Sequence, residues 1–205
     1  MWTETYLESP LKGLEPVHRP AETADSERLR ISERAFLDLA VLRGNARSPD
    51  FAKALERALG TAPPLAPNTV VHGHRHLLAW MGPDEWWLQS LAPARPALEQ
   101  TLRPLLQGLS ACVVDVSSGY TVLELSGEHA RDVLAKGCPL DLHPRVFGPG
   151  QCAQSHYFKA GVMVRALDEG GVEVVVRRSF ADYVGRMLLE AGREFLPATQ
   201  GNERA

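Results

Sequence analysis

Leu77-Leu-Ala-Trp-Met-Gly-Pro-Asp-Glu-Trp-Trp-Leu-Gln-Ser90 is the stretch of sequence that decides the fold. It holds three of the four tryptophans, in two apolar runs separated by a Gly-Pro-Asp-Glu turn. Gly82 tolerates positive φ and Pro83 fixes φ at about −65°, which suits a reversal between two strands. So much aromatic area has to be buried, either in the chain's own core or against another chain.

The composition describes a globular chain. It has 205 residues, 44% of them hydrophobic, and a formal net charge of −3. This charge gives no reason to expect nucleic acid or an anionic membrane as a partner. No apolar run reaches the ~20 residues that span a bilayer, and the acidic N-terminus lacks the apolar core of a signal peptide. Three widely spaced cysteines favour reduced thiols in the cytoplasm over a disulfide framework.

Polarity and periodicity divide the chain into an arm, two halves and a tail. Residues 1–26 are polar and aperiodic, and contain the apolar island Ser9-Pro-Leu-Lys-Gly-Leu14. An unstructured segment is one interpretation, and an extended arm that folds against a partner is the other. Residues 27–110 and 111–196 are predicted as two α+β subdomains, and 197–205 as a disordered tail.

The first half shows one clear helix among several strands. Ser48 can cap it, Pro49 suits its first turn and Gly60 its end, so we predict a helix over 48–60. A second helix is predicted over 93–109. The strands are predicted at 28–32, within 36–42, at 70–81 and at 86–90.

The second half repeats this theme. Strands are predicted at 112–115, 120–125, 152–158, 162–167 and 172–177, with helices over 127–136 and 180–191. Gly170-Gly171 predicts a tight hairpin, and Ser179 can cap the last helix. The order β-α-β-β-α is typical of a ferredoxin-like plait, with helices on one face of an antiparallel sheet. The fold class is therefore α+β with two plait subdomains.

His72-Gly-His-Arg-His76 has the look of a metal site. On one continuous strand, residues 72, 74 and 76 point to the same face, and three imidazoles can bind Zn²⁺. The neighbouring residues are basic, and no carboxylate or thiolate stands close in sequence to support the ligands. A polar strand edge is therefore the preferred interpretation, and no metal site is predicted.

Two further segments carry nucleophiles. In Asp115-Val-Ser-Ser-Gly119 a carboxylate and two hydroxyls precede a glycine, without a Gly-x-Ser-x-Gly pattern or an evident base. Local hydrogen bonding is the favoured role of this segment. Cys138 follows a predicted helix end, where nothing lowers a thiol pKa, so it is predicted as a buried structural thiol, as are Cys112 and Cys152. No catalytic residue is predicted.

Arg177-Arg178 stands before the last helix and suits either an anion or an inter-subunit ion pair. No nucleotide-binding glycine loop is present in the sequence, so no cofactor-binding residue is predicted.

Taken together, several segments resemble the gamma subunits of heterotetrameric sarcosine oxidases. They are Ser9-Pro-Leu-Lys-Gly13, Trp80-Met-Gly-Pro-Asp-Glu-Trp-Trp-Leu88, Asp115-Val-Ser-Ser-Gly119, Gly137-Cys-Pro-Leu-Asp-Leu142 and Arg178-Ser-Phe-Ala-Asp-Tyr183. The resemblance runs from Ser9 to about Leu196 and rests on the order and spacing of these motifs. The chain is more distantly similar to the folate-binding domains of glycine-cleavage T-protein.

The resemblance implies a non-catalytic assembly role. In such enzymes the alpha subunit carries NAD and a tetrahydrofolate site, the beta subunit carries FAD and FMN, and the delta subunit holds zinc. The complex converts sarcosine, tetrahydrofolate and O₂ into glycine, 5,10-methylene-tetrahydrofolate and H₂O₂. The chain itself is expected to bind no cofactor and to contact chiefly alpha. Six interface residues are predicted: Leu11, Leu14, Trp86, Trp87, Arg177 and Arg178.

Two alternatives stay open. One is a folate- or anion-binding module in which Arg177 and Arg178 engage a glutamyl tail. The other is a hydrolase that uses Ser117 or Cys138 as its nucleophile.

Overall fold

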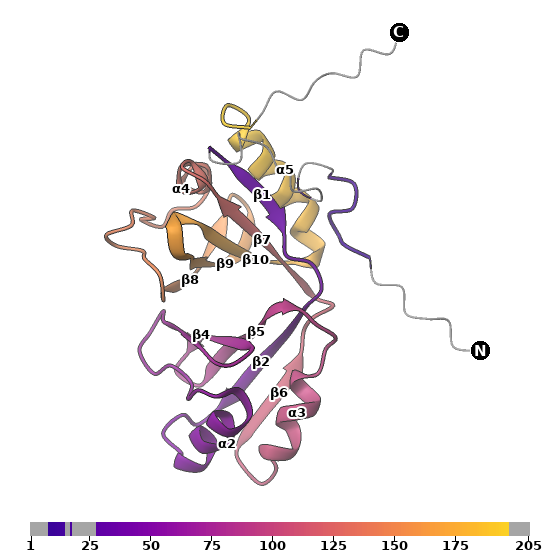
Figure 1. Ribbon diagram of the computed structural model, residues 1–205, viewed down its shortest axis with the longest axis vertical. Coiled ribbons are helices and arrows are strands. Elements are labelled where there is room, and N and C mark those ends of the chain that lie inside the picture. The colour runs from indigo at the N-terminus through magenta and orange to yellow at the C-terminus, as the bar shows by residue number, and fades with distance from the viewer. Residues whose placement is uncertain (1–7, 15–16, 18–27, 197–205) are drawn as a thin grey trace, which may run out of the picture.

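The computed structural model describes residues 8–14, 17 and 28–196, which fold into two five-stranded antiparallel sheets (Figure 1). The first sheet has the order β3-β4-β5-β2-β6, with bounds β2 Leu37–Gly44, β3 Val70–His72, β4 His76–Gly82, β5 Glu85–Pro93 and β6 Ala111–Asp115. The second has the order β1-β7-β10-β9-β8, with bounds β1 Arg30–Glu33, β7 Tyr120–Ser126, β8 Cys152–Tyr157, β9 Ala160–Ala166 and β10 Val172–Arg177. The α+β class is confirmed.

Helices cover the outer face of each sheet (Figure 1). On the first sheet lie α2, Pro49–Leu59, and α3, Leu98–Leu105. On the second lie α4, Ala130–Ala135, and α5, Ala181–Gly192. The limits of α2 confirm the sequence prediction, because the Ser48 side chain accepts a hydrogen bond from the Phe51 N–H and Gly60 ends the helix at φ 80°.

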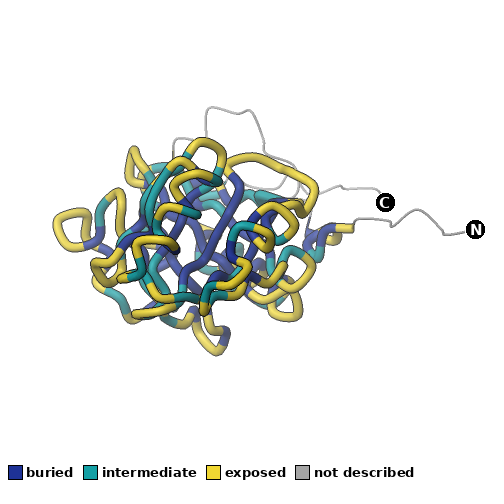
Figure 2. Tube along the Cα trace, turned by 90° about the horizontal axis from the view of Figure 1, so that it is seen from below, coloured by how far each residue is buried: buried dark blue, intermediate teal, exposed yellow. Residues whose placement is uncertain are grey.

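The inner faces of the two sheets pack against each other, so the molecule has four layers, helices, sheet, sheet and helices. Strand alternation produces this arrangement. On β5, Trp86 and Leu88 join the core under α2 and α3, whereas Trp87 joins the apolar layer between the sheets. On β10, Val174 faces α4 and α5, and Val175 faces the other sheet. Figure 2 shows this buried interior enclosed by exposed loops.

Two strands lie in the sheet formed mainly by the other half of the chain. β1 pairs with β7, with Ile31 opposite Leu125, and β6 pairs with β2, with Val114 opposite Val41. Sequence order had assigned the first of these strands to residues 27–110 and the second to 111–196, and the pairing corrects both assignments. Periodicity identifies a strand but not its neighbour, and the chain crosses between the sheets at 34–36 and again at 116–119.

Three local predictions are also corrected. The predicted strand 70–81 is a hairpin of β3 and β4, with Val71 opposite Leu78, because the chain turns back at Gly73. The hairpin expected at Gly170-Gly171 exists, but its connection includes a 3-10 turn at Asp168–Gly170. Ser179, predicted to cap the last helix, lies instead in a 3-10 turn at Arg178–Phe180, and α5 begins at Ala181 without a side-chain cap.

The described part of the arm packs on the chain's own last helix. Leu11 and Leu14 are buried against α5, where a Cβ at Gly185 would lie 3.2 Å and 2.8 Å from their methyl carbons. The apolar island of the arm therefore has a docking place within its own chain. Most of the predicted arm, and the tail at 197–205, lie outside the described residues.

Candidate functional site

A cavity of about 310 Å³ lies where the chain crosses between the sheets. It is built from segments far apart in sequence, because the arm, both crossings, the β5–α3 connection and the end of β10 meet there. Its polar lining consists of Glu8, Ser9, Glu33, Asp115, Ser117, Ser118, Thr121 and Arg178, and its aromatic lining of Phe36 and Tyr120.

Two carboxylates in this cavity are held by hydroxyl and amide donors. Glu33 accepts hydrogen bonds from the hydroxyls of Ser9 and Thr121, the latter at 2.5 Å. Asp115 Oδ1 accepts from the backbone N–H of Ser117 at 3.0 Å and from its hydroxyl at 2.6 Å. Within the described part of the chain, neither carboxylate makes an ion pair with a lysine or arginine. Both therefore bring negative charge to the cavity that no direct ion pair in the described part of the chain neutralises.

Arg177 and Arg178 are exposed, as an interface role requires. The Arg178 guanidinium donates to the carbonyl of Glu8 at 2.5 Å, which ties the end of β10 to the arm. The Arg177 guanidinium lies 5.8 Å from the centre of the Tyr120 ring. Among the described residues that line the cavity, Arg178 is the one cationic side chain and three carboxylates accompany it, so a bound anion is electrostatically disfavoured there.

Ser117 holds the first sheet to the β6–β7 crossing. Its hydroxyl accepts from the Leu39 N–H at 2.9 Å and lies 3.2 Å from the Leu39 carbonyl, besides its contact with Asp115. The predicted local hydrogen bonding of Asp115–Gly119 is confirmed. A nucleophilic serine is typically activated by a histidine, whereas the hydrogen bonds among the described residues join Ser117 to the Asp115 carboxylate and the Leu39 backbone and to no histidine.

The three histidines do not share one strand face. His72 ends β3, His74 lies in the turn and His76 begins β4, because the chain reverses between them. Burial lowers the pKa of His76, which favours its neutral form. Among the described residues, no group of three or more histidine, cysteine or acidic side chains is placed to hold a metal ion.

The cysteines are free thiols in different surroundings. Cys138 and Cys152 are buried as predicted, and burial raises the pKa of Cys152 to about 11. Cys138 Sγ lies 3.7 Å from the Ser155 hydroxyl. Cys112 is exposed, which corrects its prediction as a buried thiol: β6 is an edge strand, and Cys112 and Val114 lie exposed on the face opposite the buried Val113.

The tryptophans expected at an interface belong to the chain's own core. Trp86 is 0% and Trp87 3% exposed. Trp86 donates to the carbonyl of Pro64 at 2.9 Å and packs on Phe51, and Trp87 meets the ring of Tyr120 edge-on at 5.1 Å. The expectation of exposed aromatic residues is therefore wrong for both, since strands β4 and β5 are covered on both faces. Leu11 and Leu14 are likewise buried within the chain.

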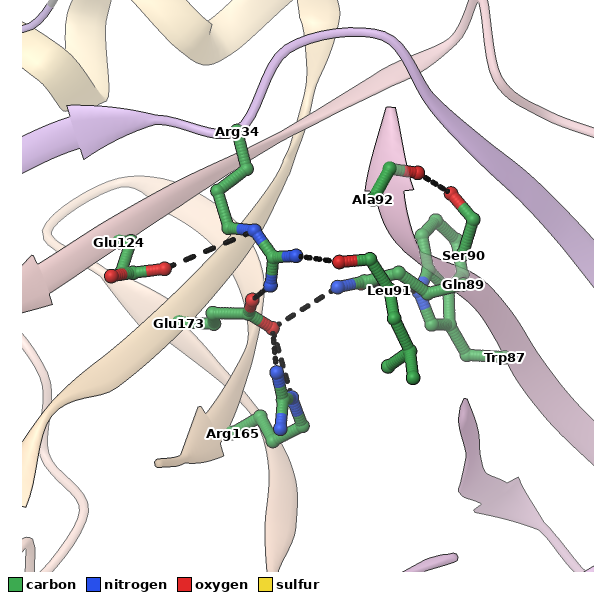
Figure 3. A network of polar contacts seen from close by, with 9 residues as sticks. All are labelled: Arg34, Trp87, Gln89, Ser90, Leu91, Ala92, Glu124, Arg165 and Glu173. Atoms are coloured by element: carbon green, nitrogen blue, oxygen red, sulfur yellow. Dashed lines mark hydrogen bonds and ion pairs between the residues drawn. The ribbon is translucent and has the colours of Figure 1, made fainter. Parts of the chain in front are cut away.

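A buried ionic cluster between the sheets is absent from the sequence predictions (Figure 3). Glu173 is fully buried, and its Oε2 accepts two hydrogen bonds from Arg165. Gln89 of the first sheet donates to the same oxygen at 3.1 Å, and Arg34 pairs with the other oxygen. Arg34 also donates to the carbonyl of Leu91 at 2.6 Å.

This cluster links the two sheets through Gln89, which reaches Glu173, and through Arg34, which contacts both Glu173 and the Leu91 carbonyl. A buried ion pair keeps its charges only when the remaining lone pairs and protons find partners, and here Gln89 and the Leu91 carbonyl provide them. The one sequence signal was a glutamate inside the apolar run Val172-Glu-Val-Val-Val176. The arrangement explains how the sheets are held in register, and it offers no open position for a substrate.

Comparisons with known proteins agree over most of the chain. The model of the family described as "Sarcosine oxidase, gamma subunit family" matches residues 43–194. Sarcosine oxidase subunit gamma of Corynebacterium sp. (strain U-96) is 34% identical over 193 residues, which cover 93% of this chain and 92% of that protein. The subunit gamma of Arthrobacter sp is 33% identical over 192 residues, with coverages of 93% and 92%.

Solved structures give the same result. A chain of the heterotetrameric sarcosine oxidase from Corynebacterium sp. U-96, solved in complex with pyrrole 2-carboxylate, is similar with a TM-score of 0.79 and 30% identity, over 94% of this chain and 98% of that one. The glycine cleavage system aminomethyltransferase T from Bartonella henselae is similar with a TM-score of 0.66 and 16% identity, over 90% of this chain and 57% of that one. The second likeness shows a shared fold.

Proposed function

Because the chain belongs to the sarcosine oxidase gamma subunit family, we propose that it is a non-catalytic structural subunit of a heterotetrameric sarcosine oxidase. The observation that carries the proposal is the extent of the structural match, which covers 94% of this chain and 98% of a chain from such an enzyme. The two chains therefore share one fold over nearly all of the length compared.

The local chemistry supports a structural role. Ser117 and Asp115 hold the β2 and β6 ends together, and Cys138 is buried. The reaction that the resemblance implies, demethylation of sarcosine with tetrahydrofolate and O₂, belongs in this proposal to groups on the sister subunits alpha, beta and delta. Contact chiefly with alpha is part of the same proposal and rests on the family resemblance.

We also propose a cellular compartment for the assembly. Three free thiols suit a reducing compartment, and we place the complex in the cytoplasm. In the described part of the chain, no helix combines the length and apolarity that crossing a bilayer requires.

Co-expression with the sister subunits of the same enzyme tests the proposal. We expect the chain to co-purify in a fixed ratio with a tagged alpha subunit, and to be required for a complex of full size on analytical ultracentrifugation. A chain that stays apart from the complex, or that oxidises sarcosine without the other subunits, would contradict it.

A pair of variants tests the non-catalytic role within the assembled enzyme. Ser117→Ala should keep kcat within about twofold of wild type, while lowering the melting temperature because the Leu39 backbone loses its hydroxyl partner. The exposed neighbour Ser118→Ala is the control and should change neither value. A kcat lowered about a thousandfold by Ser117→Ala alone, at normal stability, would restore the nucleophile hypothesis.

A further inference from the structure

Phe36 has an unusual combination of backbone and exposure. Its φ is 60°, in the left-handed region that a bulky side chain rarely occupies. The residue is 44% exposed and lines the 310 Å³ cavity. The backbone is fixed from both sides of the crossing, since the Phe36 carbonyl accepts from Ala94 N–H at 2.9 Å and Arg34 N–H donates to Val122 at 2.8 Å. The fold therefore holds Phe36 in an energetically unfavourable backbone conformation that leaves the residue partly exposed to solvent.

Phe158 offers an internal comparison. It too has a positive φ, 48°, and the residue is 42% exposed. Its ring, however, packs edge-on against Tyr157 at 4.9 Å and covers Gly137, where any Cβ would lie 2.6 Å from it. Phe158 thus has a role in its own fold. In the described part of the chain, no other aromatic ring packs on Phe36. Ring packing of the kind seen at Phe158 therefore does not explain why an aromatic residue occupies this position.

The charge of the cavity indicates which kind of group would bind beside the Phe36 ring. Glu33 and Asp115 are unpaired by cations in the described part of the chain, whereas the Glu8 carboxylate is bound by Lys12 at 2.8 Å. Arg178 directs one hydrogen bond to the Glu8 carbonyl. Two carboxylates beside exposed aromatic surface form a receptor for a cation with an apolar stem, as lysine and arginine side chains have.

The size of the cavity sets a limit. About 310 Å³ is at the lower end of the range of roughly 300–1,000 Å³ for small-molecule sites, so one long side chain fits better than a folate or dinucleotide.

We propose that a sister subunit docks here, inserting a lysine or arginine side chain toward Glu33 and Asp115 while its neighbouring apolar side chains cover the ring of Phe36. The inference rests on the proposed function, because it takes the partner from the assembly. It adds the place and the chemistry of contact, and it makes Phe36 a central contact residue of the kind that dominates interface energies.

Variants with opposite effects on folding and assembly test the proposal. Phe36→Asn removes the ring and places at φ 60° a residue that tolerates the left-handed region. The chain alone should keep or raise its melting temperature. The co-expressed complex should lose the chain more readily, with an apparent Kd at least about tenfold higher. Phe158→Asn is the matched control, with the same replacement at a similar φ outside the cavity, and should bind like wild type.

The charge requirement has its own variant. Glu33→Gln with Asp115→Asn keeps side-chain oxygens as hydrogen-bond acceptors and removes both charges. Association should weaken about tenfold or more in low salt, and its dependence on NaCl concentration should become shallower. Association rate and Kd at several salt concentrations, measured by biolayer interferometry on the tagged complex of sister subunits, give both quantities.

The outcomes distinguish a failure of the proposed function from a failure of the docking place alone. If the wild-type chain does not join the complex, the proposed function fails and this inference with it. If wild type joins and either Phe36→Asn or the charge-free variant binds with wild-type affinity, the docking place alone is overturned. Should the variants not fold, hydroxyl-radical footprinting of wild type decides: protection of Phe36 on assembly supports the proposal, and equal labelling of free and assembled chain overturns it.

Discussion

Arg165 on β9 and Glu173 on β10 lie opposite each other on adjacent antiparallel strands, and two guanidinium nitrogens of the arginine donate to one carboxylate oxygen at 2.8 and 2.5 Å. The pair points into the layer between the sheets, where Arg34 and Gln89 complete its coordination (Figure 3). The contact between the sheets is thus partly ionic, beside an apolar layer that includes Trp87, Met163 and Val175.

Removing the glutamate should be costly. Glu173→Ala leaves Arg165 buried and Arg34 half-buried without their shared partner, and we expect the free energy of unfolding to fall by about 3–5 kcal/mol. Urea unfolding followed by tryptophan fluorescence measures it. Glu190→Ala, on an exposed helix face, is the control and should change the value by less than about 0.5 kcal/mol. If Glu173→Ala and wild type had equal free energies of unfolding, the cluster would make no net contribution to stability.

The arm should contribute to stability without any partner. Leu11 is 0% exposed against α5, so Leu11→Ala should lower the free energy of unfolding of the isolated chain by about 2–4 kcal/mol. Leu65→Ala, at a residue 65% exposed, is the matched control and should have little effect. If both variants unfold like wild type, the arm is held only in the assembly, as the partner-dependent interpretation of the sequence requires.

Thiol labelling should distinguish the three cysteines. Cys112 is exposed on the edge strand β6, whereas Cys138 and Cys152 are buried. A disulfide reagent at pH 8 should modify one thiol of the native chain rapidly, and the other two only in denaturant. The variant Cys112→Ser should abolish the fast phase. Rapid labelling of that variant would contradict the burial of the other two.

Cys152 should make stability depend on alkaline pH. Burial raises its pKa from 9.0 to about 11, so the unfolded chain loses this proton at lower pH than the folded chain. The contribution of the thiol is therefore present below about pH 9 and lost as the pH rises toward about 11. Chemical denaturation of wild type and Cys152→Ala across this range measures the difference. Parallel curves would show that the thiol does not titrate in this way.

Local signals in the sequence predicted much of the secondary structure. The Ser48 cap, Pro49 and Gly60 predicted the limits of α2, because capping depends on a few neighbouring residues. The tryptophan-rich hairpin was predicted from its turn, and Trp80 does pair with Trp86. The α+β class followed from the order of these elements.

Features that depend on distant partners were not predicted. The exchange of β1 and β6 is decided by pairing between residues 90–96 positions apart for β1 with β7 and 67–75 positions apart for β6 with β2, which no local pattern encodes. Trp86 and Trp87 were expected at an interface, since sequence shows that an aromatic residue is buried but not by what. The ionic cluster and the positive φ of Phe36 likewise arise only where separate segments meet.

The exchanged edge strands have a consequence for how the polypeptide reaches its native state. Neither half possesses all the strands of its own sheet. A fragment ending near residue 110 would lack β6 and leave β2 as an exposed edge strand. The two sheets are thus expected to melt in one cooperative transition, and a gene split between them should yield two insoluble products unless both are made together.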